Sequence, residues 1–149
     1  MNLTEISQIL SGIVATIPNT LYLRATDIDA NISVDNVDLS GKTVTLFNNL
    51  PEVPHLVSGS GAVTRQWPIE IKVLQLANLD DTTPQSDVIR DACLAIADEI
   101  WDKVTAHQDL PNSFEYAINF LNDVKIYDKT MTGCTLTFIL NTVRTSYKC

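Results

Sequence analysis

The sequence predicts an α+β fold, in which an antiparallel or mixed β-sheet carries two main helices on one face and bears extended loops and hairpins. Three observations predict it. Residues 83–105 repeat apolar side chains at intervals of three and four, which is the spacing of one helix face. Residues 3–17 repeat the same pattern near the N-terminus. Most other segments alternate apolar and polar residues, as half-buried strands do.

The predicted helix over 83–105 has clear signals at both ends. Thr83 is the expected N-cap, Pro84 suits the first helical position, and Pro111 prevents the helix from continuing. The apolar stripe consists of Ile89, Cys93, Ile96, Ile100 and Val104, widened by Ala92, Ala97 and Trp101. The opposite face is acidic and contains Asp87, Asp91, Asp98, Glu99 and Asp102. Because these carboxylates lie away from the stripe, we expect a solvated or interface surface, not a buried acid–base pair.

The predicted helix over 3–17 has a narrower apolar stripe. The stripe consists of Leu3, Ile6, Ile9, Leu10, Ile13 and Val14, and the expected wet face of Thr4, Ser7, Gln8 and Ser11. Gly12 and the β-branched residues lower the intrinsic helix propensity. We therefore expect this helix to depend on docking against the sheet.

Strands are expected over residues 20–25, 27–35, 43–47, 69–77, 114–126 and 134–143. In the strand over 69–77, Ile69, Ile71 and Val73 share one face, and the other face changes from polar at Glu70 to apolar further on. The last two segments predict a long antiparallel hairpin. Residues 56–65 predict a flexible loop or hairpin tip.

Length and composition restrict the class of protein. At 149 residues the chain fits a single domain over 1–149, and its net charge of −8 argues against sequence-independent binding to DNA or to an anionic membrane surface. No apolar run is long enough to span a bilayer, and the N-terminus lacks the features of a signal peptide. The three cysteines without a C-x-x-C motif predict reduced thiols made in a cytosol.

The sequence contains one candidate metal site, a pattern that resembles a calcium loop. Asp27, Asp29, Asn31 and Asp38 occupy positions 1, 3, 5 and 12 of an EF-hand-like calcium loop. Ile32 stands where that loop needs glycine, and the flanking segments are not helical. The strand interpretation of 27–35 is therefore preferred, and a calcium-binding module over Asp27–Asp38 is kept as an alternative.

Other chemical signals are weak. His55 and His107 lie in different predicted loops without partners at metal-ligand spacing. The Gly-x-Gly segment of Gly59 and Gly61 is not followed by the lysine and the helix that a phosphate-binding loop requires. Trp67 and Trp101 are expected in the core or in a subunit contact, not in ligand stacking. No catalytic residue, cofactor or metal is therefore predicted, and the chain is not expected to be an enzyme.

The order of these elements resembles that of a known family. A first helix and acidic strands precede a Gly/Ser-containing extension, then Trp67-Pro68-Ile69-Glu70-Ile71, the long helix from Ser86 through Trp101, and a closing hairpin. This layout, over nearly the whole chain, is similar to the small neck and tail-completion proteins of tailed bacteriophages, above all the tail-terminator type.

The resemblance implies a structural role without catalytic residues. It implies a ring, hexameric or alternatively dodecameric, that caps the tail tube and joins it to neck and connector proteins. Such a subunit is made in the host cytoplasm and resides in the virion, with no membrane partner. The segment that would contact a neighbouring subunit or ring consists of Val57, Ser58, Gly59, Ser60, Gly61, Ala62 and Val63. DNA would pass through without sequence-specific binding, along a channel lined by the acidic helix face or by Asp27, Asp29 and Asp35.

A function of another class is left open by the residues. The aromatic and carboxylate side chains near the 83–105 helix also fit a small-molecule-binding or enzymatic α+β domain, with a pocket between that helix and the sheet. Large flat subunit contacts would favour assembly, and a deep apolar cavity with converging polar groups would favour this alternative.

Overall fold

The computed structural model describes residues 2–25, 38–48, 55–59, 62–78, 80–110, 116–126 and 129–144. Within these ranges the elements follow in the order α1 (Leu3–Ala15), β1 (Thr20–Ala25), β2 (Thr43–Asn48), β3 (His55–Gly59), β4 (Ala62–Leu76), α3 (Thr83–Ala106), β5 (Tyr116–Ile126) and β6 (Lys129–Arg144). The predicted strand over 27–35 lies outside the described residues. None of the helices in the described ranges is long and apolar enough to cross a membrane.

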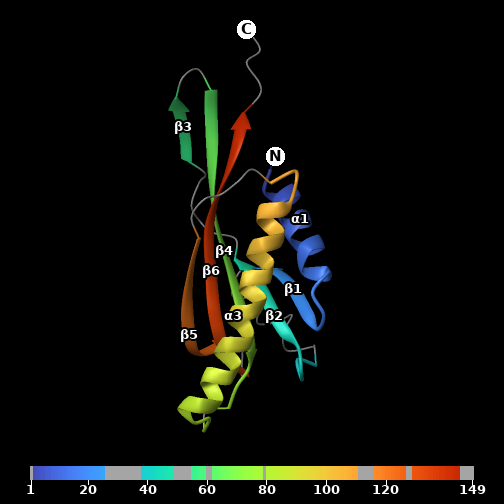
Figure 1. Ribbon diagram of the computed structural model, residues 1–149, viewed down its shortest axis with the longest axis vertical. Helices are drawn as coiled ribbons and strands as arrows, with labels where there is room; N and C mark the ends of the chain where they lie inside the picture. The colour runs from blue at the N-terminus through green and yellow to red at the C-terminus, as the bar shows by residue number, and fades with distance from the viewer. Residues whose placement is uncertain are drawn as a thin grey trace.

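The described strands form one mixed sheet in the order β1-β2-β4-β6-β5, and β3 pairs in addition with β4. The β1–β2 pair is parallel and all other pairs are antiparallel. β5 and β6 form the predicted long hairpin, with an irregularity between Leu121 and Val124. Both helices pack on the same face of the sheet (Figure 1). The predicted α+β class is confirmed.

The main core lies between the helices and the sheet. It is formed by the alternate side chains of the central strands together with the inner faces of both helices. Its buried members include Ile6, Leu10, Phe47, Trp67, Ile69, Ile71, Val73, Cys93, Ala97, Ile100, Val104, Cys134, Leu136, Phe138 and Leu140. The predicted strand faces are therefore correct for β4 and β6, and burying each large side chain contributes roughly 1.5–3 kcal/mol.

The opposite face of the sheet is only partly covered. A smaller cluster of buried residues consists of Leu39, Val44, Leu46, Leu74 and Met131. On this face of β4, Glu70 and Lys72 are half-buried and Leu74 is fully buried, as the change from polar to apolar residues predicts. Leu76 is 38% exposed, so the covered region ends before the end of the strand.

The N-cap of helix α3 lies one residue earlier than predicted. Thr82, not Thr83, is the N-cap, and the Gln85 side-chain oxygen accepts hydrogen bonds from the Thr82 N–H (2.7 Å) and hydroxyl (3.0 Å). These contacts fix the start because Gln85 stands three residues after Thr82, at the position from which a side chain can bond back to the N-cap. Ala92, predicted to widen the buried stripe, is exposed.

Helix α1 ends two residues earlier than predicted, at Ala15. Its N-cap is Asn2, which forms a capping box with Glu5. Ser7, expected on the wet face, is only 6% exposed, because its hydroxyl lies 2.8 Å from the Tyr22 hydroxyl of β1. The contact with Tyr22 of β1 thus allows this polar residue of α1 to be buried in the core.

Candidate functional site

A three-stranded arm extends the sheet beyond the helices. β3 pairs with β4 from His55↔Gln66 to Gly59↔Ala62. The same stretch of β4 pairs on its other side with the end of β6, from Val63↔Arg144 to Gln66↔Asn141. Figure 1 shows this arm projecting past the ends of α1 and α3. An antiparallel ribbon of this kind extends the backbone of the sheet beyond the part that α1 and α3 cover.

Pro68 lies in β4 next to the arm, where a proline in a central strand needs an explanation. On one side Pro68 faces Ile139 of β6. On the other side, the pairing with β3 ends at Gln66 and the pairing with β2 begins at Ile71, so residues 67–70 have no partner strand there among the described residues. This gap accommodates a residue without an N–H, and it separates the arm from the body of the sheet.

The described residues of the predicted contact segment lie at one end of the arm. Val57, Ser58 and Gly59 belong to the end of β3, and Ala62 and Val63 begin β4. Ser60 and Gly61 lie outside the described residues. The expected loop or hairpin tip is thus a β-hairpin, and the structure places five of the seven predicted residues on its two strands.

The predicted acidic channel residues cannot be placed. Asp27, Asp29 and Asp35 lie outside the described residues. Of the alternative calcium loop only its last residue is described: Asp38 accepts a hydrogen bond from the Ser40 N–H at 3.0 Å, which is a local turn contact. Within the described ranges, no group of three or more His, Cys, Asp or Glu side chains could hold a metal ion.

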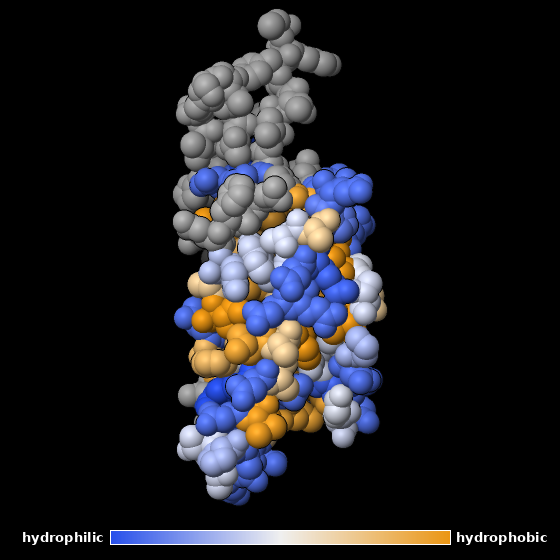
Figure 2. Space-filling model, in the orientation of Figure 1, coloured by the Kyte–Doolittle hydropathy of each residue, from blue (hydrophilic) through white to orange (hydrophobic). Residues whose placement is uncertain are grey.

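The acidic face of α3 is exposed, as predicted. All five of its carboxylate residues are exposed: Asp87, Asp91, Asp98, Glu99 and Asp102. Two of them pair with basic neighbours on the same helix, Asp87 with Arg90 at 2.6 Å and Glu99 with Lys103 at 3.6 Å. Figure 2 shows hydrophilic residues on this side of the molecule, with hydrophobic residues visible between them.

The tryptophans take part in packing. Trp67 is 9% exposed, and the guanidinium carbon of Arg65 lies 5.6 Å from the centre of its ring. Trp101 is partly buried and stacks on Tyr116 with ring centroids 4.7 Å apart. The prediction of core roles is confirmed for Trp67 and holds in part for Trp101.

The described sheet ends in β1 on one side and in β5 on the other. Among the described strands, each of these two pairs with one neighbour only. On β5, Tyr116 is 47% and Phe120 53% exposed. On α3, Val88 is 70% exposed. Exposed strand edges and apolar side chains together are features of surfaces that bind other chains.

The space between α3 and the sheet is filled. Cys93, Ala97 and Ile100 are fully buried there, and Val104 is 2% exposed. Burial raises the pKa of the Cys93 thiol to about 12, and the nearby Cys134 adds to the rise. Burial likewise raises the pKa of Cys134 to about 11, with a smaller contribution from Asp98. These thiols are therefore poor nucleophiles, because the thiolate is the reactive form.

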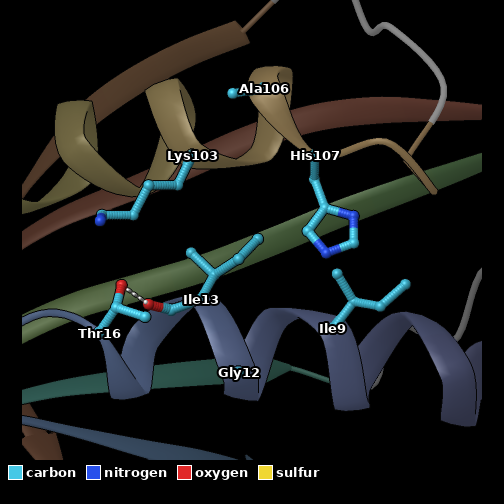
Figure 3. Close-up of a pocket in the computed structure, with 7 residues that line it drawn as sticks. All are labelled: Ile9, Gly12, Ile13, Thr16, Lys103, Ala106 and His107. Atoms are coloured by element: carbon cyan, nitrogen blue, oxygen red, sulfur yellow. Dashed lines mark hydrogen bonds between the residues drawn. The ribbon is translucent and has the colours of Figure 1, made fainter.

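A groove that the sequence did not predict lies between the two helices. It has a volume of about 430 Å³ and is lined by Ile9, Gly12, Ile13, Thr16, Lys103, Ala106 and His107. Figure 3 shows the last turn of α3 lying along α1, with Lys103 near Thr16 at one end and His107 near Ile9 at the other. The only local signal for it was Gly12, a helix-weakening residue in the middle of a predicted helix.

No protein-family model matches the chain, and no curated protein is significantly similar to it.

Proposed function

We propose that this chain is a virion structural protein, a ring-forming subunit at the head–tail junction of a tailed bacteriophage. In this role it caps the tail tube and links it to the neck, without enzymatic activity. The proposal rests on the resemblance of its sequence layout to tail-terminator proteins and on three features of the fold. Its partners are further copies of the chain, in a hexameric ring in the first place, together with the tail-tube and neck proteins.

The observation that carries the proposal is the arm formed by β3, β4 and β6. The β4–β6 ladder runs from Leu76↔Met131 to Val63↔Arg144, so the arm continues the paired backbone of the central strands away from the helix-covered core. A monomer gains little from such an extension, because a ribbon without a covering layer buries little apolar surface. A subunit that must reach an adjoining ring gains a contact from it.

The open edges of the sheet supply a second support. A ring requires two different surfaces on each subunit, since heterologous contacts close only when one patch meets another on the next copy. β1 and β5 lie at opposite ends of the strand order and therefore provide two such surfaces. Antiparallel pairing between β5 of one copy and β1 of the next is compatible with their directions in the sheet.

The charge supports the passage of DNA through the ring. The net charge of −8 and the exposed carboxylates of α3 disfavour adhesion to phosphates. A conduit that DNA crosses without being held benefits from such a surface. The proposed channel lining includes this helix face or Asp27, Asp29 and Asp35.

Native mass spectrometry and negative-stain electron microscopy of the full chain, alone and mixed with purified tail tubes, test the proposal. We expect rings that bind one end of the tube. Free monomers alone are compatible with assembly on a template. A chain that remains monomeric and binds neither tubes nor connectors overturns the proposal.

A variant pair isolates the arm. Val57→Asp with Val63→Asp places two charges on the predicted contact segment. Thr4→Asp with Gln8→Asp adds the same charge to exposed positions of α1 and serves as the matched control. We expect the first pair to lose tube binding and the control to retain it. Equal binding by both variants would remove the arm from the contact.

A further inference from the structure

We propose that the groove between α1 and α3 is a binding site for a small amphipathic anion, a molecule with a short hydrocarbon chain and one carboxylate. The site is independent of ring assembly, because its lining comes from two helices of one chain. Its volume of about 430 Å³ falls within the range of roughly 300–1,000 Å³ that is typical of small-molecule sites.

The packing of the chain does not require the glycine at position 12, which lines the groove. Glycine in a helix interior costs about 1 kcal/mol relative to alanine. A Cβ added to Gly12 would meet no atom within 4 Å, and its φ angle is not positive. Neither crowding nor backbone conformation therefore explains the glycine. Its missing side chain does keep the groove open in the middle, where a hydrocarbon chain would lie.

The floor of the groove is apolar. Ile13 is 6% exposed and Ile9 is partly buried, and both project from α1 toward α3 (Figure 3). Ala106 lines the facing helix. The Thr16 hydroxyl donates its proton to the Ile13 carbonyl oxygen at 2.7 Å, so it has no proton left for a ligand. The side chains that could donate to a ligand are thus those of Lys103 and His107.

Both of these groups can donate a hydrogen bond to a carboxylate, and the charge of Lys103 favours an anion. The Nδ1 atom of His107 accepts a hydrogen bond from the Asp109 N–H at 3.2 Å, which places the proton of the neutral ring on Nε2. Figure 3 shows the ring nitrogen farther from the backbone pointing toward α1. Lys103 adds a full positive charge at the other end of the groove. A carboxylate can therefore be held at either end while the chain covers Ile9 and Ile13.

Glu99 opposes anion binding. Its carboxylate lies 3.6 Å from the Lys103 ammonium, with the two side chains 46% and 37% exposed. A long, exposed ion pair of this kind is weak, so Lys103 can turn toward a ligand at little cost. The affinity of the site for an anion should therefore depend on the charge of Glu99.

Titration of the ¹⁵N-labelled full chain with octanoate, followed by two-dimensional NMR, tests the site. We expect saturable shifts confined to residues 9–16 and 103–107. Gly12→Leu fills the groove and abolishes these shifts, and Gly12→Ala, the matched control for the loss of glycine, retains them. Circular dichroism confirms that both variants are helical. Shifts elsewhere, no shifts, or unchanged binding by a helical Gly12→Leu variant would refute the proposal.

A second titration series tests the preference for an anion. Octanamide has the same chain without the charge, and we expect it to bind at least fivefold more weakly than octanoate. Lys103→Gln should weaken octanoate binding about fivefold and Glu99→Gln should strengthen it, the ratio that corresponds to ~1 kcal/mol. Asp91→Asn removes the same charge two turns earlier on α3 and should have no effect. Equal affinity for both ligands would overturn the assignment of an anion.

Discussion

The backbone of Gly133 on β6 lies directly against that of Val73 on β4. A Cβ added to Gly133 would sit 1.9 Å from the Val73 carbonyl oxygen and 3.0 Å from the Cα of Leu74. Because both neighbouring atoms belong to the backbone of the longest strand pair, no side chain can move aside to make room. The close approach of the two strands here therefore requires glycine at this position.

Gly133→Ala is expected to destabilise the fold by about 3 kcal/mol or more, because the added methyl group forces two paired strands apart. The free energy of unfolding, measured by urea denaturation and circular dichroism, is the readout. Gly12→Ala makes the same chemical change in open space and should instead raise stability by up to ~1 kcal/mol. Equal effects of the two substitutions would contradict the strand geometry at Gly133.

The Ser7–Tyr22 contact should behave as a coupled pair. Tyr22→Phe leaves the buried Ser7 hydroxyl without its partner and is expected to cost ~1 kcal/mol. In a double-mutant cycle with Ser7→Ala we expect a coupling energy of about 1 kcal/mol, since the two hydroxyls satisfy each other. Additive single-mutant effects would show that the hydroxyls do not interact.

Burial raises the pKa of Tyr22 above its ordinary value of 10.0, and this outweighs the lowering by the Ser7 hydrogen bond and by the charge of Arg24. The folded state thus binds the tyrosine proton more tightly than the unfolded state. Its stabilising effect is complete below pH 10 and is lost as the pH rises further. We expect wild-type stability to fall more steeply than that of Tyr22→Phe between pH 10 and 11. Parallel profiles would exclude Tyr22 as the cause.

The thiols of Cys93 and Cys134 should resist labelling in the folded protein. Both side chains are fully buried, and their pKa values are raised to about 12 and about 11 from 9.0. In a Cys149→Ser background at pH 8, we expect a maleimide to label neither thiol until urea unfolds the chain. Rapid labelling without denaturant would contradict the packing of α3 on β6.

The same thiols predict a loss of stability at high pH. Because their folded pKa values lie above the unfolded value, their stabilising effect is complete below pH 9 and is lost as the pH rises toward 12. Unfolding free energies measured between pH 8 and 11 should therefore decline less in Cys93→Ala than in the wild type, relative to each variant's value at pH 8. Identical relative declines would show that Cys93 is not the group responsible.

The periodicity of the sequence alone was sufficient to predict which residues are buried where the packing pattern repeats along a single helix or strand. The stripe containing Cys93, Ile100 and Val104, and the alternation through Leu136 and Phe138, are local patterns, and their burial follows directly from them. The predicted N-cap of α3 was wrong by one position because two adjacent threonines can both cap a helix. Only the contact to Gln85 distinguishes them.

Residues whose environment depends on another element could not be predicted in this way. Ser7 is buried because Tyr22 of β1 reaches it, and Ala92 is exposed although it directly precedes the fully buried Cys93. The predicted strand begins at Ile69, whereas β4 already begins at Ala62, and the gap between β3 and β2 in the described sheet leaves room for Pro68 inside the strand. The groove depends on how two helices align, which no single periodic pattern contains.

Substitutions of two phenylalanines on neighbouring strands should distinguish effects on folding from effects on assembly. Phe138 on β6 is 3% exposed, and Phe120 on β5 is 53% exposed beside a hollow lined by Asp87, Arg90 and Asp91. Phe138→Ala creates a cavity in the core and should cost about 3–5 kcal/mol. Phe120→Ala removes little buried surface and should change the free energy of unfolding by ~1 kcal/mol or less.

Phe120→Ala, the substitution with the smaller effect on the free energy of unfolding, should have the larger direct effect on ring assembly. If the β5 edge joins neighbouring subunits, Phe120→Ala removes an aromatic side chain from the contact and weakens ring formation on the tail tube, although the fold stays intact. Sedimentation velocity and electron microscopy at matched protein concentrations measure this effect. A Phe120→Ala variant that assembles like the wild type would move the subunit contact away from β5, toward the arm or the outer surface of α3.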